Sequence, residues 1–234
     1  MAAQPSARAC AKSINAAACA RCARPKGVSW HSAERRTPIT TVPGFFIWHE
    51  LITSDPVAAT KFYADVVGWS AAPAPDAPMP YWLMSAQGEP VAGIMKTMEH
   101  ASHPGWCGYV GVDDVDATTA KATSLGSKVV APPTDIPNVG RFAVFNDPQG
   151  AVIGLMKWNA GMPASKLKPG DNGFVAWNEL YTIDAEKALA FYAALFGWKE
   201  DHVMDMGPMG KYRIFSNGGR QIGGMMNRPP HMQV

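Results

Sequence analysis

Cysteine is scarce in this chain, and its distribution excludes one class of fold. The 234 residues contain four cysteines, three of which, Cys10, Cys19 and Cys22, lie within the first 40 residues. Only Cys107 belongs to the remainder, so we expect no disulfide framework and a reducing, cytoplasmic compartment. The CARC segment at 19–22 has zinc-like spacing, but no second ligand pair follows it. A zinc site is therefore not expected there.

Long apolar runs are also missing from the sequence. No segment is long enough to span a membrane, and the N-terminal stretch lacks the apolar core of a secretory signal. Residues 1–41 are rich in Ala, Arg and Ser and nearly free of acidic residues. This composition fits a disordered basic extension, and it also resembles a transit peptide. We expect the disordered extension and no association with a membrane.

An excess of positive charge is confined to that extension. The net charge is +2, but the first 40 residues hold seven Lys and Arg and one acidic residue. The rest of the chain has 14 basic and 18 acidic residues, so its net charge is −4. A mildly acidic body argues against a nucleic-acid partner.

What the chain does contain is an internal repeat. Residues 44–69 match residues 173–198 at a constant offset of 129. After a two-residue insertion the match resumes in the segments that follow. An internal repeat fixes the architecture before any single motif is considered. The repeated pairs are Gly44 and Gly173, Trp48 and Trp177, Glu50 and Glu179, Asp55 and Asp184, Phe62 and Phe191, Tyr63 and Tyr192, Gly68 and Gly197, and Trp69 and Trp198.

Each copy reads as a strand, a helix and two or three further strands. The opening segment FFIWHELIT is rich in β-branched and aromatic residues, which favours a strand. Ser54 or Asp55 can cap the helix, Pro56 suits its first position, and Gly68 ends it. Apolar residues recur between them at helical spacing. The unit is βαβββ.

A diverged third version of the unit lies between the two copies. It opens with a strand at 106–112, a helix capped by Asp113 or Asp114, and later strands joined by the turn DPQG at 147–150. Residues 159–172 are polar and rich in Gly and Pro, which is typical of a linker.

These units predict the domain organisation. Modules 42–98 and 105–158 form a first domain, 42–158, and residues 173–230 form the first half of a second domain. The second half of that domain is missing, so one hypothesis is that the chain is an inactive fragment of a longer two-domain protein.

Paired βαβββ units with FY…GW in the first and VDDVD…GR…DPQG in the second resemble the vicinal oxygen chelate superfamily. This superfamily includes glyoxalase I, bleomycin-resistance proteins and extradiol dioxygenases. The chain is most similar to two-domain bacterial glyoxalase-like proteins. The resemblance implies an α+β fold in which tandem modules form cupped mixed sheets around a ligand site. It does not imply one reaction, because a fold does not determine a function.

The resemblance also locates the family's metal ligands, usually two His and two Glu. It places them at Trp48 and Cys107 on the first strands and near Gly93 and Gly154 on the last strands. Trp and Gly have no metal-binding side chain, and a catalytic ion takes three or four N, O or S ligands. We therefore expect no metal and no other cofactor, with a divalent metal as the alternative.

Glu50 is the leading catalytic candidate, with Glu179 as its equivalent in the repeat. Side chains alternate along a strand, so Trp48 and Glu50 share the face that points into the cup, and His49 points away. A desolvated Glu is a candidate general base, and the alternative is a structural Glu paired to a backbone group or to an Arg inside the sheet. Candidate substrate-binding residues, each with packing or ion pairing as the alternative, are Trp48, Tyr81, Cys107, Tyr109, Arg141, Trp177 and Tyr212.

Three functions remain open at this point. The first is a glyoxalase-like enzyme, a lyase, isomerase or oxygenase, acting on a small carbonyl, hydroxylated or aromatic compound. The second is a non-catalytic, bleomycin-resistance-like binding protein, and the third is the inactive fragment. His100 and His103 are too few to predict a metal site. We expect a small-molecule ligand and a homodimer through residues 173–230, because half a cup leaves open strand edges.

Overall fold

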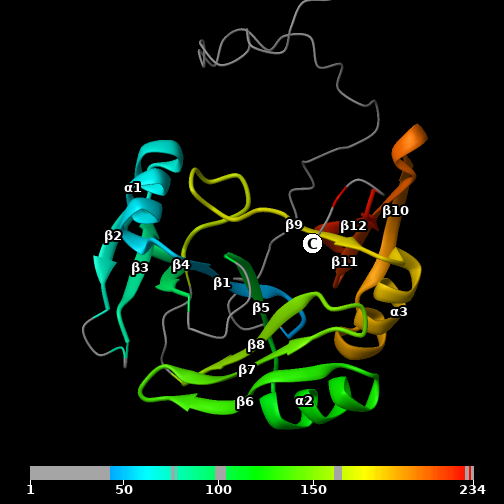
Figure 1. The fold of residues 1–234 in the computed structure, drawn as a ribbon, viewed down its shortest axis with the longest axis horizontal. Coiled ribbons are helices and arrows are strands. Elements are labelled where there is room, and N and C mark those ends of the chain that lie inside the picture. The colour runs from blue at the N-terminus through cyan, green and yellow to red at the C-terminus, as the bar shows by residue number, and fades with distance from the viewer. Residues whose placement is uncertain are drawn as a thin grey trace, which may run out of the picture. The chain divides into compact units, whose positions relative to one another are not determined.

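The structure is a computed structural model that describes residues 43–74, 77, 79–97, 104–160, 165–229 and 232. Cys10, Cys19, Cys22, His100 and His103 lie outside these residues, as does the predicted extension 1–41. The described part is a mixed α+β fold with two cupped sheets, which confirms the predicted fold class. Its helices and strands fall into three groups in Figure 1, which we call modules 1, 2 and 3.

The three modules repeat one order of elements. Module 1 contains β1 (Phe46–Thr53), α1 (Pro56–Val67), β2 (Ser70–Pro73), β3 (Tyr81–Ala86) and β4 (Glu89–Lys96). Module 2 contains β5 (Gly105–Gly111), α2 (Val115–Ser124), β6 (Lys128–Ile136), β7 (Gly140–Asn146) and β8 (Val152–Trp158). Module 3 contains β9 (Asn178–Thr182), α3 (Ala185–Phe196), β10 (Lys199–Asp205), a 3-10 turn (Gly207–Met209), β11 (Lys211–Asn217) and β12 (Arg220–Asn227).

The predicted helix signals are confirmed. The side chains of Asp55, Asp114 and Asp184 accept hydrogen bonds from the first turns of α1, α2 and α3. This satisfies backbone N–H groups that have no partner within a helix. Gly68 and Gly197 end α1 and α3 in the left-handed conformation, with φ of 74° and 78°, which favours glycine.

Modules 1 and 2 share one eight-stranded sheet in the order β2-β3-β4-β1-β5-β8-β7-β6. The two halves meet at the antiparallel pair β1–β5, in which Trp48 lies opposite Tyr109 and Glu50 opposite Cys107. Module 3 forms a separate four-stranded sheet, β10-β11-β12-β9, with β9 at its edge. In module 3, therefore, no described strand takes the place that β5 takes beside β1.

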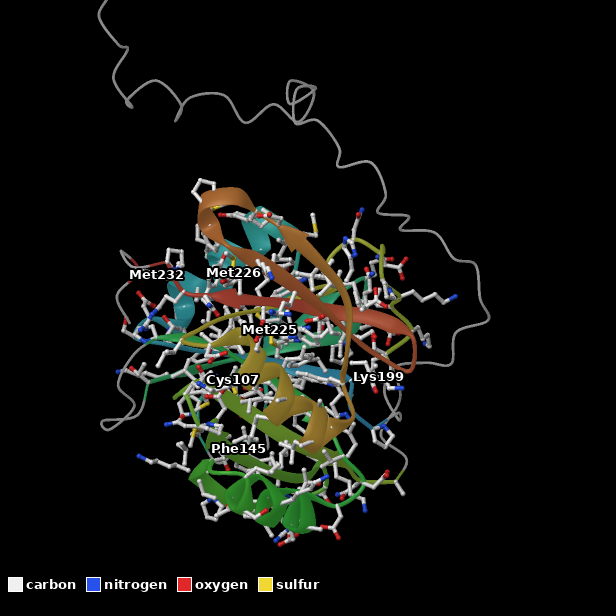
Figure 2. The ribbon with its side chains drawn as sticks, turned by 90° about the vertical axis from the view of Figure 1, so that its right-hand side faces the viewer. Cys107, Phe145, Lys199, Met225, Met226 and Met232 are labelled. Atoms are coloured by element: carbon white, nitrogen blue, oxygen red, sulfur yellow. The ribbon has the colours of Figure 1, made fainter. Side chains whose placement is uncertain are left out.

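Modules 1 and 3 contact each other through equivalent residues. The indole N–H of Trp69 donates to the Gly173 carbonyl at 2.8 Å, and that of Trp198 donates to the Gly44 carbonyl at 2.7 Å. Trp69 of module 1 contacts module 3 in the same way that its equivalent Trp198 contacts module 1. The two modules are therefore related by an approximate two-fold axis. One main core joins module 2 to α3, with Phe145 fully buried and labelled between α3 and α2 in Figure 2.

Candidate functional site

A hydrogen-bonded network joins three of the predicted site residues in module 1. The Trp48 indole N–H donates to the Tyr81 hydroxyl at 3.0 Å. The Tyr81 hydroxyl also hydrogen-bonds the Glu50 carboxylate. Strand alternation puts Trp48 and Glu50 on one face of β1, and the order β1-β4-β3 brings Tyr81 beside them. A carboxylate thus lies among aromatic side chains on the concave face of the sheet.

Module 2 completes this network from the other half of the sheet. The Tyr109 hydroxyl donates to Glu50 Oε2 at 2.9 Å, across the β1–β5 pair. Cys107 and Tyr109 are buried, and Trp158 packs edge-on against Trp48 with ring centroids 5.9 Å apart. The structure therefore brings Trp48, Glu50, Tyr81, Cys107 and Tyr109 together. Alternation along the first strands predicted only that Trp48 shares a face with Glu50, and Cys107 with Tyr109.

Burial controls the protonation of these groups. Desolvation raises the pKa of Glu50, and the hydrogen bonds from Tyr109 and Tyr81 partly oppose this. Desolvation and the nearby Glu50 charge raise the pKa of the Cys107 thiol to about 12, and they also raise the pKa of both tyrosines. Cys107 is thus a protonated thiol at neutral pH, and a thiol nucleophile is not supported.

The glycines on the last strands leave room for the two tyrosines. A Cβ on Gly93 would lie 1.7 Å from the Tyr81 hydroxyl, and a Cβ on Gly154 would lie 2.2 Å from the Tyr109 ring. Gly93 and Gly154 are the positions where the resemblance places two carboxylate ligands. Tyrosine side chains therefore fill that space. The described residues hold no group of three or more His, Cys, Asp or Glu side chains placed for a metal ion. The donor set at these four positions does not fit a divalent cation.

Module 3 repeats the network, but among the described residues no second module pairs with β9 as module 2 pairs with β1. The Trp177 indole donates to the Tyr212 hydroxyl at 2.6 Å, and Tyr212 donates to Glu179 at 2.7 Å. A Cβ on Gly224 would lie 2.0 Å from the Tyr212 hydroxyl. Glu179 is exposed, and desolvation of the half-buried Tyr212 raises its pKa to about 12.

Arg141 and His49 lie outside the network. Arg141 donates to both carboxylate oxygens of Asp116, at 2.7 and 2.9 Å, and to Asp135 at 2.9 Å. This is the ion-paired role that the sequence left open, and it raises the pKa of Arg141 and lowers that of Asp116. His49 faces away from the concave side, as predicted, and its Nε2 lies 2.7 Å from Asn178 Oδ1. Desolvation lowers the pKa of His49.

A cavity of about 440 Å³ lies on the other side of β1, between modules 1 and 2 and strand β9. Its lining includes Trp177 and Glu179 but not Trp48, Glu50 or Tyr109. Sequence reasoning missed this cavity and the direct Trp–Tyr contacts. The sequence does contain one signal for those contacts. Tyr81 precedes Gly93 by the same number of residues as Tyr212 precedes Gly224.

Comparisons with known proteins agree with this fold. The family model "Glyoxalase/Bleomycin resistance protein/Dioxygenase superfamily" matches residues 46–155. The protein CFP32 of Mycobacterium tuberculosis, a glyoxylase by name, is 35% identical over 190 residues, which are 78% of this chain and 70% of that protein. The chain belongs to the glyoxalase/bleomycin resistance/dioxygenase superfamily.

Two further likenesses extend the comparison. The anthracycline biosynthesis protein DnrV of Streptomyces peucetius is 32% identical over 170 residues, which are 66% of this chain and 61% of that protein. The Mn(II)-bound glyoxalase of Novosphingobium aromaticivorans superposes with a TM-score of 0.57 at 19% identity, over 80% of this chain and 63% of that one. The chain thus spans less than two thirds of the length of both proteins. No helix among the described residues is long and apolar enough to cross a membrane.

Proposed function

We propose that the concave face of modules 1 and 2 binds a small, flat, hydroxylated or carbonyl-bearing aromatic compound, without a metal ion at the four family positions. The observation that carries this proposal is the desolvated Glu50 carboxylate held by Tyr109 at 2.9 Å among Trp48, Tyr81 and Trp158. Aromatic walls suit a flat ligand, and a carboxylate suits a ligand hydroxyl.

Glu50 retains the capacity to accept a further hydrogen bond. An ionised carboxylate offers about four lone-pair sites, of which Tyr109 and Tyr81 occupy two. A ligand hydroxyl that donates to Glu50 forms a hydrogen bond to a charged group, worth about 1.5–3 kcal/mol. The name of the relative DnrV supports this ligand class, because anthracyclines are polycyclic aromatics with hydroxyl and carbonyl groups.

The test uses 1,4-dihydroxyanthraquinone as the probe and quenching of tryptophan fluorescence as the readout, with EDTA present. Glu50→Gln is expected to weaken binding at least about tenfold, because it removes the charged acceptor. Glu179→Gln is the matched control, since the equivalent carboxylate in module 3 is exposed in the described part of the chain, and it is expected to leave the affinity unchanged. Equal effects of the two substitutions, or binding that needs a divalent metal, would contradict the proposal.

A second candidate function is proton abstraction by Glu50. The raised pKa of Glu50 favours it, because a general base works best when its pKa approaches the working pH. The substrate would be a carbonyl compound with an acidic α-hydrogen. Exchange of the α-hydrogens of hydroxyacetone for deuterium, followed by NMR, is expected to require Glu50 and not Glu179. Exchange at the buffer rate with the parent chain would leave binding as the function.

A further inference from the structure

The 440 Å³ cavity is separate from the concave face, and its lining has a different chemical character. Among the described residues that line it, eight are aromatic, Glu179 is the only acidic one, and none is Lys or Arg. Its volume falls within the range of small-molecule pockets, about 300–1,000 Å³. An aromatic cavity with an acidic group and no basic group suits a flat ligand that carries positive charge.

Trp106 is the most exposed aromatic side chain of this cavity. It is 41% exposed, although its contacts hold it in place. Its indole N–H donates to the Tyr63 hydroxyl at 2.9 Å, and its ring packs edge-on with Tyr63 and Trp69, with centroids 5.3 and 6.2 Å apart. A large ring that is fixed but not covered is a preformed wall for the ring of a ligand.

His49 gives the cavity a hydrogen-bond acceptor. Asn178 Nδ2 donates to the Ile222 carbonyl at 3.3 Å, so Asn178 Oδ1 faces His49 and accepts from its Nε2 at 2.7 Å. Desolvation lowers the pKa of His49, so its ring is neutral at pH 7 and the one proton is on Nε2. Nδ1 therefore keeps its lone pair, and no described residue donates a hydrogen bond to it.

Glu179 gives the cavity its negative charge. Its side chain is exposed, and one carboxylate oxygen accepts from the Tyr212 hydroxyl at 2.7 Å. An ionised carboxylate has about four lone-pair sites, so Glu179 can accept further N–H groups. Side chains alternate along β9, so Glu179 and Asn178 leave the strand on opposite faces, and the cavity that both line extends around the strand. A ligand that fills it therefore needs N–H donors on two of its edges.

We propose that this cavity is a second ligand site, which binds a flat aromatic cation with N–H donors on two edges, such as a protonated, amino-substituted nitrogen heterocycle. The ring system stacks on Trp106, the carboxylate of Glu179 balances the positive charge, and Nδ1 of His49 accepts a hydrogen bond from one N–H group. An anion is disfavoured, because the described lining has no Lys or Arg to pair with it.

The probe for this site is 9-aminoacridine, a three-ring aromatic compound that is a cation at neutral pH and has N–H groups on opposite edges. Acridone is the control ligand, because it has the same three rings and no charge. Binding to the full chain at pH 7 is measured by the fluorescence anisotropy of each ligand. The chain is expected to bind 9-aminoacridine at least about tenfold more tightly than acridone. Equal affinities would overturn the proposal.

Glu179→Lys tests the charge of the cavity. It is expected to weaken binding of 9-aminoacridine at least about tenfold, because repulsion replaces attraction, and to leave binding of acridone unchanged. Asp113→Lys is the matched control, since Asp113 is exposed, does not line the cavity and gives the same change of net charge. Equal losses in the two variants would show that only the net charge of the chain matters, which would contradict a site at Glu179.

His49→Gln and Glu50→Gln locate the bound cation. Gln keeps an N–H group for Asn178 but lacks the lone pair of the ring Nδ1, so His49→Gln is expected to weaken 9-aminoacridine at least about threefold. Glu50→Gln is expected to leave its affinity unchanged. A loss in Glu50→Gln would place the cation on the concave face and overturn the second site. Failure of 1,4-dihydroxyanthraquinone to bind would refute the proposed function alone, because that probe tests the other site.

Discussion

Modules 1 and 3 carry the same Trp–Tyr–Glu–Gly set in two different surroundings. In module 1 the Glu50 carboxylate is enclosed by module 2 and receives a hydrogen bond from Tyr109. In module 3 the equivalent Glu179 is exposed, although its Trp and Tyr partners keep the same contacts. The residues of each module therefore form the network by themselves, and the neighbouring module determines whether its carboxylate is enclosed or exposed. The two helices differ in the same way: α1 is largely exposed, whereas α3 is buried by module 2.

The largest difference is expected between Phe191→Ala and Phe62→Ala. Phe191 is packed edge-on against Phe145, with ring centroids 6.3 Å apart, so its removal leaves a cavity and costs about 3–5 kcal/mol of unfolding free energy. Phe62 is mostly exposed, so its removal changes stability by less than about 0.5 kcal/mol. Urea unfolding measures both. Similar costs at the two sites would show that α1 is covered in the free chain.

The next difference concerns the glycines beneath the tyrosines. In Gly93→Ala the new Cβ collides with Tyr81, which is enclosed by Trp48 and Glu50, and overpacking of this kind costs about 1–3 kcal/mol. In Gly224→Ala the collision is with Tyr212, which has solvent on one side and can rotate away. A smaller loss in urea unfolding is therefore expected for Gly224→Ala. Equal losses would contradict the claim that the first network is enclosed while its equivalent in module 3 is open on one side.

The repeat and the helix caps made most of the fold predictable from sequence. Local rules specify where Asp55 caps a helix and where Gly68 ends it, and alternation places Trp48 and Glu50 on one face. The contacts of Glu50 could not be predicted in the same way. Tyr109 reaches it through the register of β1 against β5, which is set by pairing between segments 59 residues apart. Arg141 likewise finds Asp116 through folding rather than through a local motif.

The smallest expected effect is the pH dependence of stability at Glu50. Burial raises the pKa of Glu50 in the folded state above its ordinary value of 4.5. Between the two values the folded state binds more protons than the unfolded state, so stability falls as the pH rises through this window. The Glu50→Gln variant has no carboxyl group at this position, so its stability does not fall with pH for this reason. The difference in unfolding free energy, parent minus variant, is therefore expected to decrease with pH, by at most about 1.4 kcal/mol per pH unit because one proton is involved.

Tyr109→Phe tests the part that module 2 plays in this effect. The Tyr109 hydrogen bond lowers the pKa of Glu50, so its removal is expected to raise that pKa further and to extend the window to higher pH. Urea unfolding between pH 4 and 8 measures the parent, Glu50→Gln, Tyr109→Phe and the double variant. Because the Tyr109→Phe effect requires a carboxylate at Glu50, it is expected to vanish in the Glu50→Gln background. A pH dependence of Tyr109→Phe that persists there would mean that another group titrates, and that enclosure by module 2 does not distinguish Glu50 from Glu179.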